Sequence, residues 1–444
     1  MTLTTSPFAT ADPTRAEVPP TLVEPNPKAL GLTDQLGLWT NFGITLLGFA
    51  GASLILGTDL SVAAALGAVL VGTLIGAGAL ALTASAGALT GAPAMVMLRG
   101  LVGGRVSYFP TLLNILQCIG WGTFEVVTIA SAAHQIASDV PKWAFVLLAG
   151  ALTIAMTIRP LGAIRVLRKY VTVAVVVVLI YLSVQLLRNP LPAWNDGSWS
   201  GFWGAVDLPI AVAVSFVPLA ADYSRHSRSA RAAMTGAFVG FGIGQIVCYG
   251  IGILALTTVA KDGDVAGAFI AIPVGTLCFA ILALRELDLS FADVYSTAVS
   301  IQNARPRWDR RLLATLIGSV TTGLALWFGI SDYQNFLLLL GSVFVPLTAV
   351  LLVDFFLLAR RNWDVSETAP ARWGNLVPWV LGFFVYQLVN PGDVTGWTRM
   401  WTDIADGIGF TPQPWMSASL SSLVVAGAST ALIGLPNRWR RSRG

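Results

Sequence analysis

The chain has 444 residues, of which 55% are hydrophobic and only 11% are charged, and its mean hydropathy is +0.72. Soluble domains carry roughly a quarter of their residues as Asp, Glu, Lys and Arg, so this composition excludes an ordinary soluble domain and predicts one membrane domain. The net charge of +4 and the isoelectric point near 9.1 do not indicate nucleic-acid binding, because basic loops that face anionic lipid explain them.

Residues 1–30 are rich in Pro, Thr and Ser and lack the apolar core of a signal peptide, so we expect a disordered cytoplasmic tail there. Residues 31–436 form the predicted transmembrane domain, and 437–444 form a basic cytoplasmic tail. Helices 1–10 (about 37–358) make the core of that domain, and helices 11 and 12 (about 374–435) follow it. The twelve apolar runs long enough to cross a bilayer are 37–57, 60–88, 107–136, 143–158, 170–187, 203–221, 233–259, 266–300, 311–329, 334–358, 374–390 and 416–435.

Lys and Arg are concentrated in every second segment that joins these runs. The segments after runs 2, 4, 6, 8 and 10, together with the two tails, hold twenty-two of the 27 Lys and Arg residues. The opposite face holds only Lys142, Arg188, Lys261 and Arg399, and Arg285 lies inside a run. By the positive-inside rule both termini are cytoplasmic, so we expect a multi-pass protein of the cell membrane.

The few reactive side chains argue against an enzyme. Cys118, Cys248 and Cys278 all lie in apolar runs with no paired spacing, and His134 and His226 form no HExxH motif or catalytic set. The sequence also lacks a Walker A motif for binding ATP, so any transport is driven by an ion gradient or by diffusion. A channel would need a continuous polar pore lining, and a receptor would need a signalling domain; the sequence shows neither. The remaining enzymatic alternative is acid-base chemistry by two carboxyl groups in the membrane.

Polar side chains inside the membrane are costly unless they face a cavity or a partner, and here they gather in runs 3 and 8. Spacings of three and four residues place each set on one helical face. The run 3 stripe is Asn114, Gln117, Trp121 and Glu125, and the run 8 stripe is Glu286, Ser290, Asp293 and Thr297. Arg285 and Asp288 lie on a neighbouring face and could form an internal ion pair. The alternative is that both stripes only join helices by hydrogen bonds.

A Trp face beside a carboxylate suits a flat ring such as a nucleobase, because stacking covers the ring and the acid accepts hydrogen bonds from its N–H edge. Helix breakers occur in two runs: Gly43, Gly48 and Gly51 in run 1, and Pro209 and Pro218 in run 6. Interrupted helices at matching places are typical of inverted-repeat transporters with a site at the membrane midplane. Here helices 1–5 would match helices 6–10.

Four segments resemble the nucleobase:cation symporter family, which includes purine-cytosine permeases and hydantoin transporters. They are GAPAMVMLRGLVGGRVSYFPTLLNILQCIGW before and in run 3, ADYSRHSR after run 6, FADVYSTAVSIQN in run 8 and DYQNFLLLLGSVFVPLTAVLLVDFFL in run 10. The resemblance covers about residues 30 to 390. It implies an all-α membrane protein with twelve transmembrane helices in the leucine-transporter type of fold, a five-plus-five inverted repeat plus two C-terminal helices, that works by alternating access.

The resemblance also implies a substrate site between broken helices 1 and 6 and helices 3 and 8. Trp121 would stack on the substrate, Glu125 takes the place of a polar amide, Phe216 would close on the other ring face, and Asp293 would bind the ring edge. The full set of expected substrate-binding residues is Trp121, Glu125, Phe216, Asp293, Gln117 and Gly48. An ionised Glu125 favours a ring edge rich in N–H groups, and it is also a candidate proton carrier.

The family's cation site lies between the break in helix 1 and helix 8 and uses oxygen ligands. Asp288, Ser290 and Glu286 are the coupling candidates here, with carbonyls near Gly48, and no metal is expected beyond Na⁺ at this site. Sodium-coupled relatives have two adjacent hydroxyl residues where this chain has Leu287 and Asp288, which favours H⁺. No cofactor is expected beyond H⁺ or Na⁺ as coupling ion.

We therefore expect a secondary symporter that imports a nucleobase, cytosine or a purine, coupled to H⁺ or Na⁺. The alternative substrates are hydroxymethylpyrimidine, hydantoin and allantoin. The alternatives of another class are a passive channel and a membrane receptor that does not transport. The expected partners are the small heterocycle and the lipid bilayer, without nucleic acid or an obligate protein partner.

Overall fold

Helices occupy every apolar run that the sequence predicts. The computed structural model describes residues 17–57, 60–191, 193–259, 265–328 and 333–441. In these residues the only β-structure is a pair of isolated bridges. The fold is therefore all-helical, and the helices differ from the predicted runs mainly where a run is broken into shorter segments.

The first five expected spans contain nine α-helices and one short π-helix. They are α1 (Leu32–Gly43), α2 (Leu46–Leu56), α3 (Val62–Thr90), α4 (Ala94–Met97), α5 (Arg99–Val102), α6 (Tyr108–Ile136), α7 (Lys142–Ile158), α8 (Pro160–Val166), η1 (Leu167–Val171) and α9 (Thr172–Leu186). Helices α1 and α2 are bent by 51° relative to each other. The long helix α6 carries the predicted run 3 stripe.

The next five expected spans begin with a second broken helix. They contain α10 (Phe202–Ser215), α11 (Val217–Ser224), α12 (Ala230–Thr235), η2 (Gly236–Phe241), α13 (Gly242–Thr258), α14 (Val265–Ala271), α15 (Gly275–Arg285), α16 (Leu287–Ala304), α17 (Arg310–Leu324), α18 (Tyr333–Leu352) and η3 (Val353–Leu358). The C-terminal part contains η4 (Trp373–Asn375), α19 (Leu376–Val389), α20 (Thr395–Gly407) and α21 (Ala418–Arg441).

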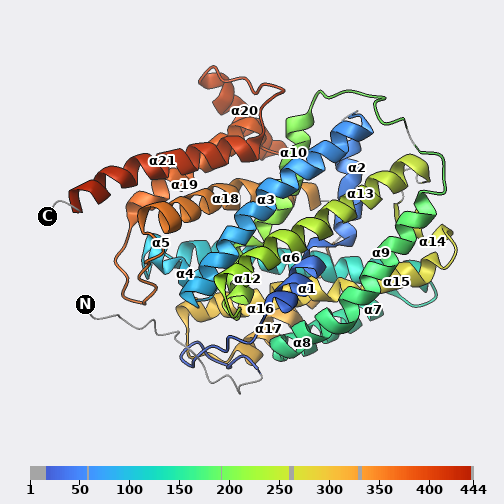
Figure 1. Cartoon of the computed structure of the whole chain (residues 1–444), viewed down its shortest axis with the longest axis horizontal. Helices are drawn as coiled ribbons and strands as arrows, with labels where there is room; N and C mark the ends of the chain where they lie inside the picture. The colour runs from blue at the N-terminus through green and yellow to red at the C-terminus, as the bar shows by residue number, and fades with distance from the viewer. Residues whose placement is uncertain (1–16, 58–59, 192, 260–264, 329–332, 442–444) are drawn as a thin grey trace.

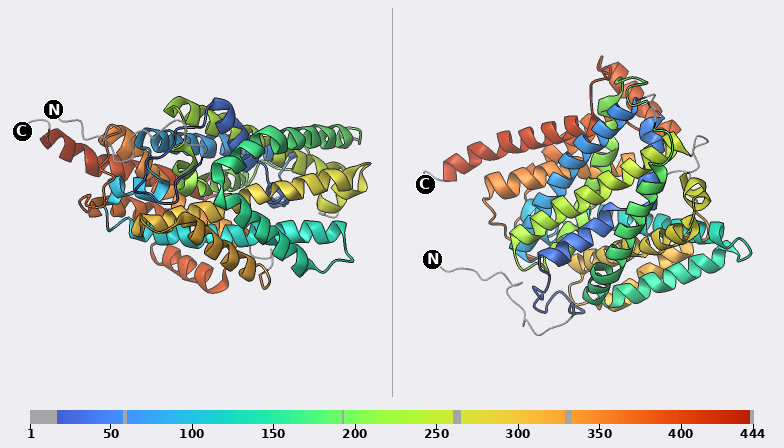
Figure 2. Two further views of the ribbon diagram at one scale, coloured as in Figure 1. Left: turned by 90° about the horizontal axis from the view of Figure 1, so that it is seen from below. Right: turned by 45° about the vertical axis from the view of Figure 1, so that its right-hand side comes forward.

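Figure 1 shows α18, α19 and α21 at one side of the bundle and α7, α8 and α9 at the opposite side, and the two views of Figure 2 keep this separation. Helix α21 packs on α18 and α19, while α10 packs on α3 and α16 packs on α6. The two broken helices and the two polar stripes therefore lie in the interior, between the two sides.

Seven helices in the described residues are long and apolar enough to cross a membrane, or eight if α1 and α2 form one bent span. Two more apolar helices, Lys142–Ile158 and Trp373–Val389, are shorter. The run expected at 266–300 is wrong as a single helix, because the chain turns at Val274, whose φ is +58°, and breaks again between α15 and α16. The count of twelve spans stays a prediction.

The two terminal tails differ from expectation in the parts that the structure describes. The first tail residues, 1–16, lie outside the described residues. Residues 17–30 pack on the bundle instead of being disordered: the Glu17 carboxylate accepts hydrogen bonds from the N–H groups of Leu161 and Gly162 at 2.7 and 3.0 Å, at the start of α8. At the other end α21 continues to Arg441, so much of the expected C-terminal tail is helical.

Small residues on α3 let the broken helix of α10 and α11 approach closely. A Cβ atom at Gly76 would lie 2.7 Å from the Cβ of Ala213, and one at Gly87 would lie 2.6 Å from the Cα of Ala221. Both distances are too short for real side-chain contacts. The α3 glycines therefore hold the backbone of the broken helix at a fixed separation from α3.

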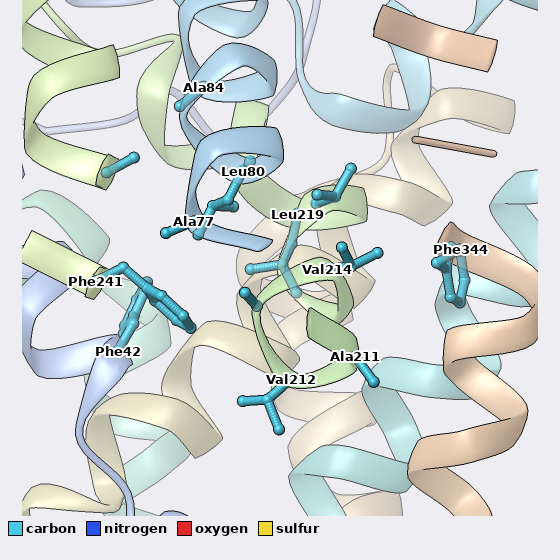
Figure 3. Packing of buried hydrophobic residues seen from close by; sticks show 14 of the residues in the cluster. Phe42, Ala77, Leu80, Ala84, Ala211, Val212, Val214, Leu219, Phe241 and Phe344 are labelled. Carbon is cyan, nitrogen blue, oxygen red and sulfur yellow. The ribbon is translucent and has the colours of Figure 1, made fainter. Parts of the chain in front are cut away.

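Apolar side chains fill the rest of this interface. Figure 3 shows Ala77, Leu80 and Ala84 on α3 beside Val214 and Leu219 of the broken helix. All five side chains belong to one buried hydrophobic cluster. Because this packing fixes one wall of the interior, it positions the residues at the break between α10 and α11.

Gly76→Ala should lower the thermal unfolding temperature of the protein purified in detergent by several degrees, because the added methyl group must displace Ala213. The matched control is Gly78→Ala, since nothing lies within 4 Å of a Cβ at that position of the same helix. Both changes gain about 1 kcal/mol of helix propensity, so only the clash separates them. Equal unfolding temperatures for the two variants would contradict the close approach.

Candidate functional site

The first span is broken directly after α1. A side chain at Gly43, the last residue of α1, would meet the carbonyl oxygen of Phe241 at 2.4 Å. Ile44 and Thr45 are extended, with φ of −101° and −154°. Thr45 then caps α2, because its hydroxyl accepts a hydrogen bond from the N–H of Leu47 at 3.1 Å. Two extended residues thus expose helix ends in the interior of the bundle.

The second break lies at Phe216, between α10 and α11. Pro218 stands in the first turn of α11, where its missing N–H costs no helical hydrogen bond. Gln117 of α6 donates a hydrogen bond to the carbonyl of Ser215 at 3.2 Å, so it satisfies an acceptor at the end of α10. The Phe216 side chain stays half-buried at this break.

A small cavity lies between the two breaks and the two polar stripes. Its volume is about 30 Å³, which is about the volume of one liquid water molecule. The lining residues come from both broken helices, from α6 and from α16. They are Thr45, Leu47, Trp121, Glu125, Val212, Ser215, Phe216, Leu219, Leu289 and Asp293.

Two aromatic side chains line this cavity and are supported by further rings behind them. Phe216 stacks on Phe42 of α1, with ring centroids 5.8 Å apart and planes inclined by 22°. Trp121 meets the edge of Phe336 of α18, with centroids 5.3 Å apart and planes inclined by 70°. Figure 3 shows Phe42 and Phe241 together beside the broken helix, and Phe241 also packs on Phe216. These contacts fix the two rings that face the cavity.

Two carboxyl groups line the same cavity. Glu125 is 3% exposed and Asp293 is 6% exposed. Glu125 lies close enough to Glu286 for the two side chains to interact directly, and its Oε2 atom has no hydrogen-bond partner in the described part of the chain. A buried oxygen of this kind can accept a hydrogen bond from a bound ring or carry a proton.

Arg285 and Glu286 connect α15 and α16 to the break in the first span. The Arg285 guanidinium donates to the carbonyl of Asn41 near the end of α1, and to Glu286 at 2.8 Å. Glu286 in turn accepts from the N–H of Leu46 at 2.8 Å and from the hydroxyl of Thr45 at 3.2 Å. One ion pair therefore satisfies backbone groups on both sides of the break.

The other predicted site residues lie outside the cavity lining. Gly48 is in the first turn of α2, where a side chain would meet Cys248 at 3.0 Å. Ser290 accepts a hydrogen bond from Thr153 at 2.9 Å. Asp288 is buried, and its Oδ2 atom has no hydrogen-bond partner among the described residues. Arg285 forms its ion pair with Glu286, and not with Asp288, which was the alternative partner.

The structure thus brings together four of the six expected substrate residues, namely Trp121, Glu125, Phe216 and Asp293, around one cavity. Gln117 supports the second break from behind. In the described residues, no group of three or more His, Cys, Asp or Glu could hold a metal ion.

Sequence reasoning missed the role of Thr45 and of the Arg285–Glu286 pair at the helix 1 break. A signal was present, because an arginine inside an apolar run needs a partner.

Comparison with known proteins gives the family. Residues 31–375 match the model of permeases for cytosine/purines, uracil, thiamine and allantoin. The chain is 26% identical over 328 residues to the putative purine-cytosine permease YxlA of Bacillus subtilis, a match that covers 67% of this chain and 70% of the relative. It is 24% identical over 349 residues to the purine-cytosine permease fcyB of Emericella nidulans, covering 69% and 66% of the two chains.

Solved structures show the same fold. Mhp1, a nucleobase-cation-symport-1 family transporter in a closed conformation with bromovinylhydantoin bound, aligns with a TM-score of 0.71 at 17% identity over 94% of this chain and 96% of the other. A Na⁺-coupled sialic acid symporter aligns with a TM-score of 0.51 at 14% identity over 90% and 95%. The predicted resemblance is confirmed: the chain is an integral membrane transporter, not an enzyme, and it belongs to the family of permeases for cytosine/purines, uracil, thiamine and allantoin.

Proposed function

We propose that this protein is a secondary symporter that imports a nucleobase, cytosine or a purine, across the cell membrane. The observation that carries the proposal is the cavity between the two broken helices, which two aromatic rings and two carboxyl groups line. Trp121 and Phe216 would cover the faces of a flat ring. Glu125 and Asp293 would bind the polar edge of that ring.

Hydantoin and allantoin are the second candidate substrates, with hydroxymethylpyrimidine as a further member of this class. The fold matches a transporter solved with bromovinylhydantoin bound, and the family description includes allantoin and thiamine. Hydantoin and allantoin carry N–H donors in their rings, and hydroxymethylpyrimidine carries a hydroxyl donor beside its ring. The carboxylates of the cavity can accept hydrogen bonds from such donors, but they do not discriminate among these substrates.

The cavity is too small to hold a nucleobase in this conformation. A nucleobase is several times larger than a water molecule, whereas the cavity has a volume of about 30 Å³. Binding and release therefore require the broken helices to move away from α6 and α16, as in alternating access. We propose that helices 1–5 and 6–10 form an inverted five-plus-five repeat for this motion, that the remaining two of twelve spans follow it, and that both termini are cytoplasmic.

The deciding experiment measures uptake of labelled cytosine by cells that lack their own nucleobase transporters. The arms are sodium present or replaced by choline, a protonophore, and competition by unlabelled purines, pyrimidines, hydantoin and allantoin. Saturable uptake that the protonophore abolishes is expected. Absence of cytosine and purine uptake at confirmed surface expression would contradict the nucleobase proposal, and the competitors would then identify the heterocycle.

Trp121→Ala should raise the apparent KM for the transported ring, because stacking of a base on an aromatic side chain contributes about 1–3 kcal/mol, or roughly 5- to 150-fold in affinity. Trp121→Phe should retain most of the affinity. The control is Trp379→Ala, since Trp379 is buried in α19 and donates to the carbonyl of Val343, away from the cavity. A Trp121→Ala variant with unchanged KM would exclude the stacking role.

Glu125→Gln should remove the pH dependence of uptake or change the order of preferred substrates. The amide cannot carry a proton between the two sides, and it presents a donor where the carboxylate only accepts. Initial uptake rates are measured across a pH series with the same competitors. Asp207→Asn is the control, because Asp207 is also a buried carboxylate but lies outside the cavity. It caps the start of α21 by accepting hydrogen bonds from two backbone N–H groups, each at 2.9 Å. A Glu125→Gln variant that matches the unmodified protein in both assays would make Glu125 a structural residue.

A further inference from the structure

We propose that the guanidinium of Arg285 acts as a built-in cation at the break in the first span, and that this protein therefore works without Na⁺. The inference deepens the proposed symport and rests on it for the uptake measurement. It assigns Arg285 as a positioning residue, which acts through the broken helix and does not touch the substrate cavity. The argument begins with the charges that a helix break exposes.

A broken helix has two ends of opposite partial charge. The last carbonyl groups of α1 carry partial negative charge, while the first N–H groups of α2 carry partial positive charge. The carbonyl of Asn41 accepts one backbone hydrogen bond, from the N–H of Ile44 at 3.2 Å, and can accept a second. Inside a membrane, both ends must find partners other than bulk water. A coupling cation that binds at the carbonyl end of α1 would satisfy the negative half of this requirement.

In this chain a side chain already supplies that positive charge. Arg285 is 1% exposed and donates to the carbonyl of Asn41, two residues before the end of α1. Its neighbour Glu286 accepts from the N–H of Leu46, the first residue of α2, at 2.8 Å. The cation thus meets the negative helix end and the anion meets the positive one.

The oxygen atoms around this position do not fit a sodium site. Na⁺ needs several oxygen ligands around one point, but the carbonyl of Asn41 accepts from a guanidinium, and the Thr45 hydroxyl donates to Glu286. The Ser290 hydroxyl, expected to be a cation ligand, is bonded to Thr153 on α7. A second positive charge at this position would also be repelled by Arg285. The donor set therefore fits a fixed guanidinium and not a bound metal ion.

A proton is then the coupling ion that this geometry accommodates. The charged groups that face Glu125 are Glu286, Asp293 and Arg285. Glu286 is held in its ion pair, and Glu125 has a carboxyl oxygen without a hydrogen-bond partner in the described residues. A proton on Glu125 would reduce the repulsion among the three carboxyl groups while the pair of Arg285 and Glu286 stays intact.

Arg285→Ala tests this in the full-length protein purified in detergent. Thermal unfolding is followed by tryptophan fluorescence in sodium chloride and in choline chloride of equal ionic strength, because a bound ion raises the unfolding temperature of the state that binds it. The unmodified protein should unfold at the same temperature in both salts. Arg285→Ala should unfold at a lower temperature in choline chloride, and sodium should restore part of the loss by occupying the vacated carbonyl end.

Two further variants make the result specific. Arg285→Lys keeps the positive charge and should remain indifferent to sodium, and it serves where Arg285→Ala does not fold. Arg310→Ala is the matched control, because Arg310 is also a buried arginine that donates to a helix-end carbonyl, that of Thr157 at 2.7 Å, outside the break. It should lose stability equally in both salts. An Arg285→Ala variant no more responsive to sodium than Arg310→Ala would make Arg285 purely structural and overturn the proposal.

Uptake separates this inference from the proposed function. Replacement of sodium by choline should leave the initial rate of uptake by the unmodified protein unchanged, and Arg285→Ala should lower it at least about tenfold. Specific stabilisation of the unmodified protein by sodium, or sodium-dependent uptake, would overturn the built-in cation. If no nucleobase or related ring is transported, the proposed function fails, but the unfolding measurement still decides on the sodium response because it needs no substrate.

Discussion

The ion pair of Arg285 and Glu286 is the interaction on which the interior of this protein depends. It joins the end of α1 to the start of α2 through backbone groups of Asn41 and Leu46. The Asn41 carbonyl also accepts from the N–H of Ile44 at 3.2 Å, so Arg285 adds a charged donor to that helix end. Glu286 supplies the acceptor for the N–H of Leu46, a group that would cost several kcal/mol if it were buried without a partner. The junction of α15 and α16 supplies both charges at the break in the first span.

The position of the break decides where the cavity lies. Thr45 stands at the break and lines the cavity, and Phe42, one turn earlier, supports the ring of Phe216 from behind. The close packing of α3 on α10 and α11 positions the break that carries Phe216, which lines the same cavity as Trp121. The position of the Phe216 ring therefore depends on the helix breaks and on the close packing at the α3 glycines, and not only on the helix that carries it.

Helix positions could be predicted from the sequence because membrane-spanning helices need long apolar runs, and because arginine-rich connecting segments mark where these runs end. The stripes of α6 and α16 could also be predicted, since helical spacing alone places Trp121 with Glu125 on one face. The break at residues 44–45 could not, because Gly48 looks as permissive as Gly43 until the backbone of Phe241 is seen against Gly43. The pairing of Arg285 with Glu286 could not be predicted for a similar reason: spacing on one continuous helix favours Asp288 as the partner, and the chain breaks between Arg285 and Leu287.

The same interior also explains why three carboxyl groups can lie so close together. Glu125, Glu286 and Asp293 would repel one another if all were charged and without compensation. Glu286 is compensated by Arg285 and by the N–H of Leu46, so only the two cavity carboxyls lack a fixed partner of opposite charge among the described ion pairs. These two carboxyl groups would therefore stabilise a proton, or accept hydrogen bonds from the N–H groups of a ring, in the cavity.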